Sequence, residues 1–335
     1  MRKLNYAGAI CEAHRQLLAS DPRVFILGQG LWSPWYAGAS MKDLDKEFGC
    51  ERVIDSPVSE NATTGAAIGA AIAGMRPIVF HPRMDFMLLA VDPIVNQAAN
   101  WSYVFEGKGS APLVIRAVIN RRGEQGAQHS QALQAMFAHI PGLKVVMPST
   151  AYDAKGLLVA ANRDDSPVMY IDDRSLYDLE EEVPKELYEV EIGKAAVRRE
   201  GTDLTIVALS SMVPKSVEAA EQLAVKGIDA EVIDLRSLKP WDRETVVASV
   251  KKTGRLLVVD EAWKTCGFAA EVAATVADEA FSSLRAPVRR TTLADAPAPS
   301  SFALEEAYYI TAEQIAEDAS ECVLGEYANP TAVAA

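Results

Sequence analysis

The chain has 335 residues, of which 49% are hydrophobic and 24% are charged. This composition is typical of a globular protein with one large or two medium cores, and it excludes a disordered, collagen-like or coiled-coil chain. The formal net charge is −13, because 33 basic side chains stand against 46 acidic ones. Phosphate backbones and anionic bilayers would be repelled by such a surface, so we expect no nucleic-acid partner and no membrane partner.

Four widely spaced cysteines form no C-x-x-C pair, which predicts neither a zinc site nor a disulfide framework and favours a reducing, cytoplasmic setting. The first 18 residues, MRKLNYAGAICEAHRQLL, are interrupted by Glu12, His14 and Arg15, so they predict an amphipathic helix rather than a signal peptide. The most apolar stretch stops at Arg76-Pro77, well short of the roughly 20 residues that a membrane span needs.

Short β-branched runs alternate with longer helical patterns along the chain, which predicts an α/β fold with a mainly parallel sheet. In the first half we expect strands at 24–27, 78–80, 113–115, 144–146 and 168–171, and helices near 41–48, 60–74, 85–105 and 151–162.

An acidic segment without a clean period, 173–193, carries Pro184 and is interpreted as the crossing between two domains. We therefore predict a first domain over residues 1–185 and a second, smaller α/β domain over 195–325. In the second domain we expect strands at 204–208, 230–234, 256–260 and 287–292, and helices at 214–225, 244–252 and 267–281.

Common catalytic signatures are missing from the sequence. There is no G-x-x-x-x-G-K-[ST], Gly28-Gln29-Gly30 lacks the third glycine of a dinucleotide loop, and no G-x-S-x-G occurs. The four histidines show no metal-ligand spacing beside acids or thiols. Hydrolase and metalloenzyme functions are therefore disfavoured.

Several strings resemble one family in the same order. They are RVIDSPVSENATTGAAIGAAIAGMRPIV, VDPIVNQAAN, GAQHSQALQAMFAHIPGLKVVMPSTAYDAKGLL, GIDAEVIDLRSLKPWD and KKTGRLLVVDEAW. They are similar to the β subunit of thiamine-diphosphate-dependent 2-oxoacid dehydrogenases, the E1 component, over about residues 4–322. The resemblance implies a pyrimidine-binding domain with a parallel sheet, followed by a transketolase-type C-terminal α/β domain.

The resemblance also implies that the chain does not work alone. The family holds the diphosphate of thiamine diphosphate, with Mg²⁺, on a Gly-Asp-Gly motif, and no such motif occurs in this sequence. We therefore expect an E1 α subunit to supply the metal site, in an α₂β₂ heterotetramer. A lipoyl E2 chain, or another acyl or ketol carrier, is the expected acceptor.

By resemblance, Glu60 contacts the aminopyrimidine ring of the cofactor. A carboxyl group bonded to the ring nitrogen opposite the amino group favours the imino tautomer, which accepts the C2 proton. The alternative is that Ser59 caps a helix and Glu60 only complements its dipole. The family context favours the catalytic role.

His129, in the string Gln128-His129-Ser130-Gln131, matches a family histidine that faces the reacting centre. A merely polar loop histidine is the alternative.

Phe86 matches the aromatic residue that stacks on the pyrimidine, with core packing as an equal alternative. By the same resemblance, a potassium ion could bind main-chain carbonyls near Leu113, Ala161, Asp164 and Ser166.

Departures from the family bear on the substrate. Gln29 stands where the family commonly has an acid, so a cofactor-side residue that could exchange a proton is replaced by a neutral one. New cationic or titratable groups occur on the segments that lead toward the cofactor. Because arginine binds carboxylate or phosphate bidentately, they suggest an extra anion on the donor or carrier, or else pairing with acids of the α subunit. These groups are His81, Arg83, Arg121 and Arg122.

Three functions follow. The first is the β chain of a 2-oxoacid dehydrogenase E1, which decarboxylates a 2-oxo acid and transfers the acyl unit, as in pyruvate dehydrogenase. The second is transketolase-like transfer of a two-carbon ketol unit in a biosynthetic pathway, which the arginine-bearing loops motivate. The third is a structural partner of an α subunit without a working cofactor site.

Overall fold

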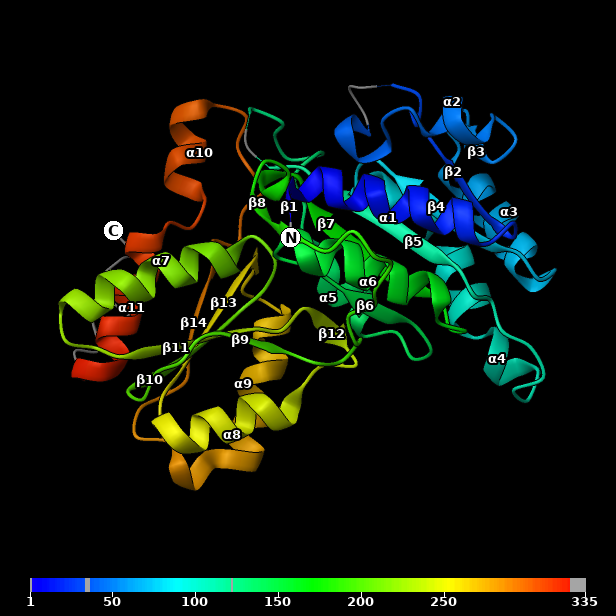
Figure 1. The fold of residues 1–335 in the computed structure, drawn as a ribbon. Coiled ribbons are helices and arrows are strands. Elements are labelled where there is room, and N and C mark those ends of the chain that lie inside the picture. The colour runs from blue at the N-terminus through cyan, green and yellow to red at the C-terminus, as the bar shows by residue number, and fades with distance from the viewer. Residues whose placement is uncertain (1, 34–36, 122, 326–335) are drawn as a thin grey trace. The chain divides into compact units, whose positions relative to one another are not determined.

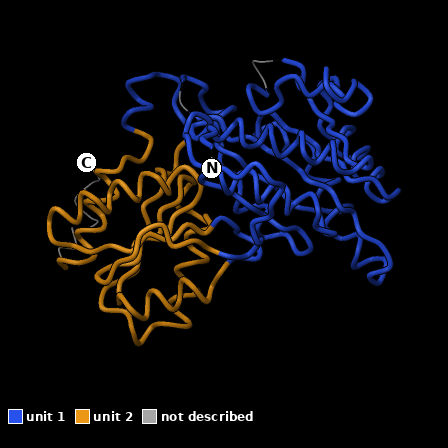
Figure 2. The backbone as a smooth tube through the Cα atoms, in the orientation of Figure 1, with its two compact units in different colours: residues 1–194, 236–241, 297–307 blue, residues 195–235, 242–296, 308–335 orange. Residues whose placement is uncertain are grey.

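The computed structural model describes residues 2–33, 37–121 and 123–325, and the chain divides into two compact units. Unit 1 comprises residues 1–194, 236–241 and 297–307, and unit 2 comprises 195–235, 242–296 and 308–335 (Figure 2). Unit 1 thus takes up two short segments from the second half of the chain. The two-domain α/β architecture agrees with the prediction.

Unit 1 is built on a seven-stranded sheet of order β12-β6-β7-β5-β4-β2-β3, in which only the edge strand β12 runs antiparallel to its neighbour. A separate antiparallel pair joins β1 to β8. The strands are β1 (Arg2–Asn5), β2 (Val24–Gly28), β3 (Val53–Asp55), β4 (Arg76–His81), β5 (Val114–Ile119), β6 (Lys144–Val146), β7 (Val168–Asp173), β8 (Glu180–Val183) and β12 (Ser237–Lys239).

Two helices of unit 1, α1 and α6, pack together on one face of this sheet (Figure 1). Side-chain caps define where they begin: Asn5 accepts a hydrogen bond from the N–H of Gly8, and Thr150 accepts one from that of Asp153. The helical segments are α1 (Tyr6–Ser20), η1 (Gly38–Met41), α2 (Leu44–Phe48), α3 (Glu60–Ile72), η2 (Phe86–Ala90), η3 (Pro93–Ala99), α4 (Trp101–Val104), α5 (Gln134–Ala138), α6 (Ala151–Arg163), η4 (Arg174–Leu176) and α10 (Phe302–Tyr308).

The core of unit 1 lies between the sheet and these helices, where Tyr6, Ile10, Leu157 and Tyr170 are almost fully excluded from solvent. A charged pair is also buried there. Arg116 donates from Nε and Nη2 to the two carboxylate oxygens of Asp172, at 2.9 and 2.8 Å. Because both side chains are wholly buried, each charge depends on the other for compensation.

Unit 2 contains a five-stranded sheet of order β14-β13-β10-β11-β9, with helix pairs α7–α11 and α8–α9 on its two sides (Figure 1). Strand β9 is antiparallel and the others are parallel. The elements are β9 (Ala196–Arg199), β10 (Leu204–Ala208), α7 (Met212–Val225), β11 (Ala230–Asp234), α8 (Arg243–Thr253), β13 (Leu256–Trp263), α9 (Phe268–Ala280), η5 (Phe281–Ser283), β14 (Arg289–Leu293) and α11 (Ala312–Leu324).

Three local predictions differ from the structure in detail. The helix expected over 85–105 is present as the successive helical segments η2, η3 and α4, joined by residues with helical dihedral angles, and Pro93 provides no N–H for a regular helix there. The helix expected over 41–48 is interrupted at Asp43, whose φ is +60°. The segment 173–193 is not only a crossing, since it contains β8, which pairs with β1 at the start of the chain.

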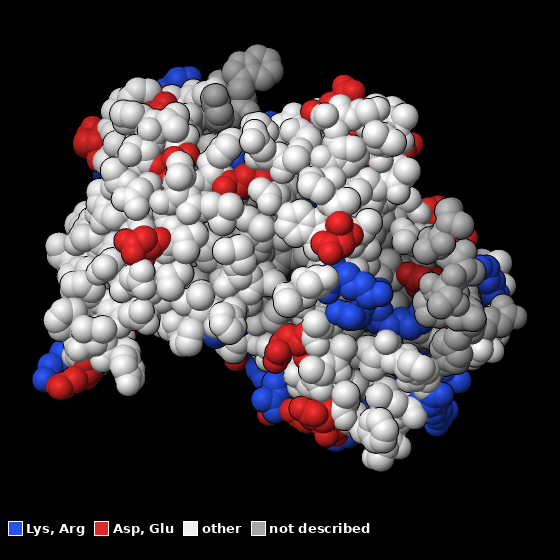
Figure 3. All heavy atoms as spheres, turned by 180° about the vertical axis from the view of Figure 1, so that it is seen from behind, with Lys and Arg blue, Asp and Glu red and all other residues white. Residues whose placement is uncertain are grey.

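Within the described ranges, every helix is too short or too polar to cross a bilayer. On the face shown in Figure 3, acidic side chains lie next to the groups of Lys and Arg, and much of the surface is uncharged.

Candidate functional site

The candidate site lies at the carboxyl ends of the parallel strands of unit 1. Strand β2 pairs with β3 on one side and β4 on the other, so the chain reverses its direction of winding at β2. Ligands of open α/β sheets bind outside the strand ends at such a switch point. Gln29 directly follows β2, His81 ends β4 and Asn120 directly follows β5.

Glu60 is the first residue of α3 and is only 4% exposed. The side-chain amide of Gln29 donates to its Oε1 at 2.9 Å. Ser59 precedes the helix, but its side chain makes no capping hydrogen bond. This absence weakens the alternative in which Ser59 only caps the helix. The buried carboxylate therefore has one defined neutral donor and further lone pairs with which to accept another.

Phe86 lies close to this end of α3. Helix η2, which begins at Phe86, packs on α3, and the side-chain amide of Asn61 donates to the carbonyl of Leu89 in η2 at 3.4 Å. The ring of Phe86 is 39% exposed, so it is not ordinary core packing. An accessible aromatic ring near a buried carboxylate suits a flat heterocycle that stacks on the ring and donates a hydrogen bond to the carboxylate.

His129 contacts Phe86 directly. The two rings meet edge to face, with centroids 5.2 Å apart and an interplanar angle of 90°. His129 is half-buried and lies in a loop between β5 and α5. The structure thus places together residues 86 and 129, which are distant in sequence, beside the helix that starts at Glu60.

Asp85 was not singled out from the sequence. Its Oδ1 accepts from the main-chain N–H of Gln131 at 3.1 Å and from the side-chain amide at 2.9 Å. Burial raises the pKa of the Asp85 carboxyl, although the two bonds from Gln131 and the nearby His129 act in the opposite direction. Its position next to Phe86, and the final glutamine of the Gln-His-Ser-Gln string, were the available signals.

His81 is buried, and its Nε2 lies 3.1 Å from the hydroxyl of Thr64, one helical turn after Glu60. Burial lowers the pKa of His81 from 6.5 to about 4, so the imidazole is neutral near pH 7. It can therefore act there as a hydrogen-bonding group but not as a cationic anchor for an anion.

The predicted arginines differ in their surroundings. Arg121 is buried and lies 3.5 Å from Asp173 at the end of β7, so an acid of this same chain compensates its charge. Arg83 is half-buried; it donates to the carbonyl of Pro82 at 2.7 Å and to the side-chain oxygen of Gln125 at 3.4 Å. Arg122 lies outside the described residues.

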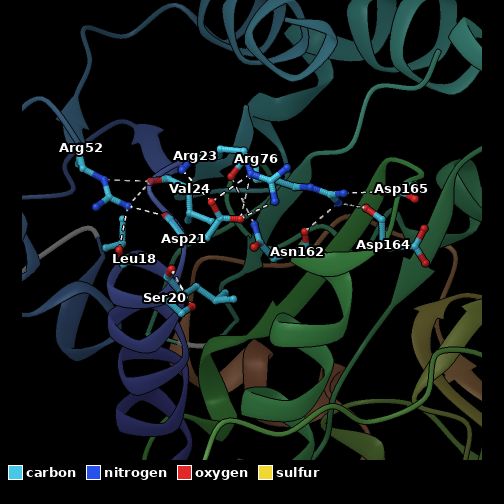
Figure 4. A network of polar contacts seen from close by, with 11 residues as sticks. Leu18, Ser20, Asp21, Arg23, Val24, Arg52, Arg76, Asn162, Asp164 and Asp165 are labelled. Atoms are coloured by element: carbon cyan, nitrogen blue, oxygen red, sulfur yellow. Dashed lines mark hydrogen bonds and ion pairs between the residues drawn. The ribbon is translucent and has the colours of Figure 1, made fainter. Parts of the chain in front are cut away.

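The residues expected to hold potassium lie around the end of α6. The carbonyl of Leu113 accepts from the N–H of Val168 at 3.0 Å. The carbonyl of Asp164 accepts from Arg76 at 2.7 Å, within the polar network of Figure 4. Lys144 forms an ion pair with the Asp164 carboxylate. A cation there would have to share carbonyl groups that already accept hydrogen bonds.

A groove of about 870 Å³ also lies in unit 1, lined by residues of η3 and α4 and by loops that include Gly142 and Ser166. Neither Glu60 nor His129 lines it. The groove is therefore distinct from the site at the strand ends, and size alone does not locate the chemistry.

Comparisons with known proteins agree with this architecture. Residues 2–180 match the transketolase pyrimidine-binding domain, and residues 193–315 match the transketolase C-terminal domain. A solved structure described as a split-gene transketolase, inactive β4 tetramer, has a TM-score of 0.79 over 96% of this chain and 98% of that one. At 24% identity, it supports the fold alone.

Two curated relatives are closer in sequence. The β subunit of acetoin:2,6-dichlorophenolindophenol oxidoreductase from Cupriavidus necator is 45% identical, over 97% of this chain and 98% of that protein. Pyruvate dehydrogenase E1 component subunit beta-1 from Arabidopsis thaliana mitochondria is 42% identical, over 91% and 85%. The chain therefore belongs to the family of thiamine-diphosphate-dependent E1-type β subunits, built from a transketolase pyrimidine-binding domain and a transketolase C-terminal domain.

Proposed function

We propose that this chain completes the active site of a heteromeric enzyme that cleaves the bond next to the carbonyl of a small substrate, a 2-oxo acid or acetoin, and transfers the acyl unit. The observation that carries the proposal is the buried carboxylate of Glu60 at the start of α3, held by Gln29. Thiamine diphosphate, when bound, supplies a nucleophilic carbon for attack on a carbonyl group.

Glu60 would hydrogen-bond the pyrimidine nitrogen and hold the proton that selects the reactive tautomer. Phe86 would stack on the ring, and His129 would hold a substrate carboxylate or move a proton. Mg²⁺ and the diphosphate are assigned to an α subunit, because this sequence has no Gly-Asp-Gly. An α₂β₂ complex, with a lipoyl E2 or another carrier as acceptor, completes the proposal.

Acetoin is a second candidate substrate because the relative named for it is 45% identical, against 42% for the pyruvate relative. A neutral hydroxyketone needs no cationic anchor. A neutral substrate of this kind suits a site in which His81 is neutral and Arg121 is paired with an acid of the same chain. Arg83 stays the candidate contact for a carboxylate.

The test uses the chain co-purified with its α subunit, thiamine diphosphate and Mg²⁺, with pyruvate and acetoin as donors and dichlorophenolindophenol as electron acceptor. Glu60→Gln and His129→Ala should each lower turnover at least about 100-fold while the complex stays assembled. Glu313→Gln is the matched control, since Glu313 is an exposed acid in the first turn of α11. Full turnover in both site variants would leave only the structural-partner role.

A potassium ion at the end of α6 is the finer part of the proposal. The carbonyls of Leu113 and Asp164 each keep a second lone pair, and those of Ala161 and Ser166 would complete the set. Thermal unfolding of the complex in KCl, NaCl and choline chloride at equal ionic strength tests it. A higher midpoint in KCl supports the ion, and equal midpoints contradict it.

A further inference from the structure

The segment 124–131, which carries His129, is bonded at each end to a carboxylate from a distant part of unit 1. At one end, the main-chain N–H of Glu124 donates to Oε1 of Glu305 in α10 at 3.0 Å. At the other end, Gln131 donates from its main chain and its side chain to Oδ1 of Asp85, at 3.1 and 2.9 Å.

Both carboxylates are almost fully excluded from solvent, with Glu305 3% and Asp85 6% exposed. Hydrogen bonds from main-chain N–H groups to a carboxylate are strong, and more so where water is excluded. The contact at Glu305 is reciprocal, because Oε1 of Glu124 accepts from the main-chain N–H of Phe302 at 3.3 Å. Helix α10 and the start of the segment are therefore bonded in both directions.

At the Glu124 end of the segment, the backbone adopts the left-handed region of φ. Glu124 has φ +61° and Gly126 has φ +68°. A Cβ at Gly126 would lie 3.2 Å from the Cβ of Ser300, just before α10. A non-glycine residue in the left-handed region persists where its surroundings hold it, and here the bonds to α10 do so.

Two contacts hold the Gln131 end of the segment. Asp85 binds Gln131, while its neighbour Phe86 contacts the ring of His129. The second carboxylate oxygen, Oδ2 of Asp85, is buried and has no hydrogen-bond partner among the described residues. A buried oxygen without a partner is unfavourable, so the bonds that Oδ1 accepts from Gln131, and not the second oxygen, fix this end of the segment.

We propose that Asp85 and Glu305 are positioning residues, which fix the two ends of segment 124–131 and thereby hold His129 against Phe86. The role in turnover rests on the proposed function, since it requires that His129 face the reacting groups. The holding of the segment itself does not depend on that function.

Hydrogen exchange of segment 124–131 in the assembled complex tests whether Asp85 and Glu305 fix the two ends of the segment. Asp85→Ala and Glu305→Ala should each raise exchange about tenfold or more at the amide that loses its acceptor, Gln131 or Glu124. Asp85→Asn and Glu305→Gln keep an oxygen that accepts the same bond, so exchange should stay near that of the unmodified chain. Glu181→Ala is the matched control, because it removes a carboxylate that accepts from the N–H of Tyr152 at 3.0 Å, at the start of α6.

Turnover per assembled complex tests the consequence. The two alanine variants should lower kcat by about 10- to 100-fold with little change in the KM of thiamine diphosphate, because a displaced His129 affects the reaction more than binding. The amide variants should restore most of kcat. Unchanged exchange in both alanine variants overturns the proposal, as does raised exchange with unchanged kcat. If the unmodified complex turns over no donor while exchange responds as expected, the holding stands and the proposed function fails.

Discussion

The side-chain amide of Gln29 donates to Oε1 of Glu60 across 2.9 Å and so connects the residue after β2 to the first residue of α3. Because the donor is neutral, the buried carboxylate gains a hydrogen bond without a neighbouring charge. An acid at position 29 would place two carboxylates within hydrogen-bond distance, and both could not be ionised at low cost. Gln29 is therefore suited to keep Glu60 oriented, and it does not carry a proton itself.

Replacing Gln29 by methionine should show this role. Gln29→Met keeps the length of the side chain but removes the donor, so we expect turnover to fall about tenfold and the free energy of unfolding to fall by about 1 to 3 kcal/mol. Steady-state kinetics and urea unfolding measure the two effects. Gln16→Met is the control, since Gln16 donates to the carbonyl of Lys185 on the exposed surface. Equal turnover in both variants would argue against the role of Gln29.

Truncating Phe86 should weaken cofactor binding more than it weakens folding. The ring is 39% exposed, so Phe86→Ala should cost the fold little, whereas a lost stacking contact of about 0.5 to 1.5 kcal/mol raises the Kd of thiamine diphosphate by up to about tenfold. Calorimetric titration of the assembled complex measures the Kd. Phe281→Ala, on a ring that is 75% exposed in η5, should leave it unchanged. An unaltered Kd in Phe86→Ala would place the ring outside the cofactor contact.

Residues of the candidate site differ in whether the sequence alone could indicate them. The sequence singles out Glu60 and His129 as candidates because short, specific strings surround them, and the structure places Phe86 beside His129. Glu305 carried no such signal, because its bond to Glu124 joins residues 181 positions apart and depends on how α10 returns to unit 1. Local patterns predict elements and motifs, but they do not contain contacts that only the tertiary fold creates.

The buried His81 predicts a dependence of stability on pH. Its pKa is lowered from 6.5 to about 4 by burial, so between these values the unfolded chain binds more protons than the folded one. Above about pH 6.5 the titration of His81 therefore costs the folded state nothing, and the free energy of unfolding falls as the pH drops from there toward about 4. Relative to His81→Phe, the unmodified chain should lose about 2 kcal/mol of unfolding free energy between about pH 7.5 and about pH 5.

Urea unfolding at the two pH values measures this difference. The fully buried His14, whose pKa is also lowered by burial, contributes equally in both chains and so cancels. Parallel losses in the two chains would show that His81 is protonated in the folded state, and the neutral assignment would then be wrong.

The buried pair of Arg116 and Asp172 should be far more sensitive to substitution than an exposed pair. Asp172→Asn leaves the Arg116 guanidinium buried without a counter-charge, which should cost about 3 to 5 kcal/mol of unfolding free energy. Glu189→Gln is the control: it breaks the pair with Arg163, in which both side chains are about half exposed, and should cost less than about 1 kcal/mol. Urea unfolding of both variants checks this contrast. Similar losses would mean that water reaches Arg116, which contradicts its complete burial between the sheet and the helices of unit 1.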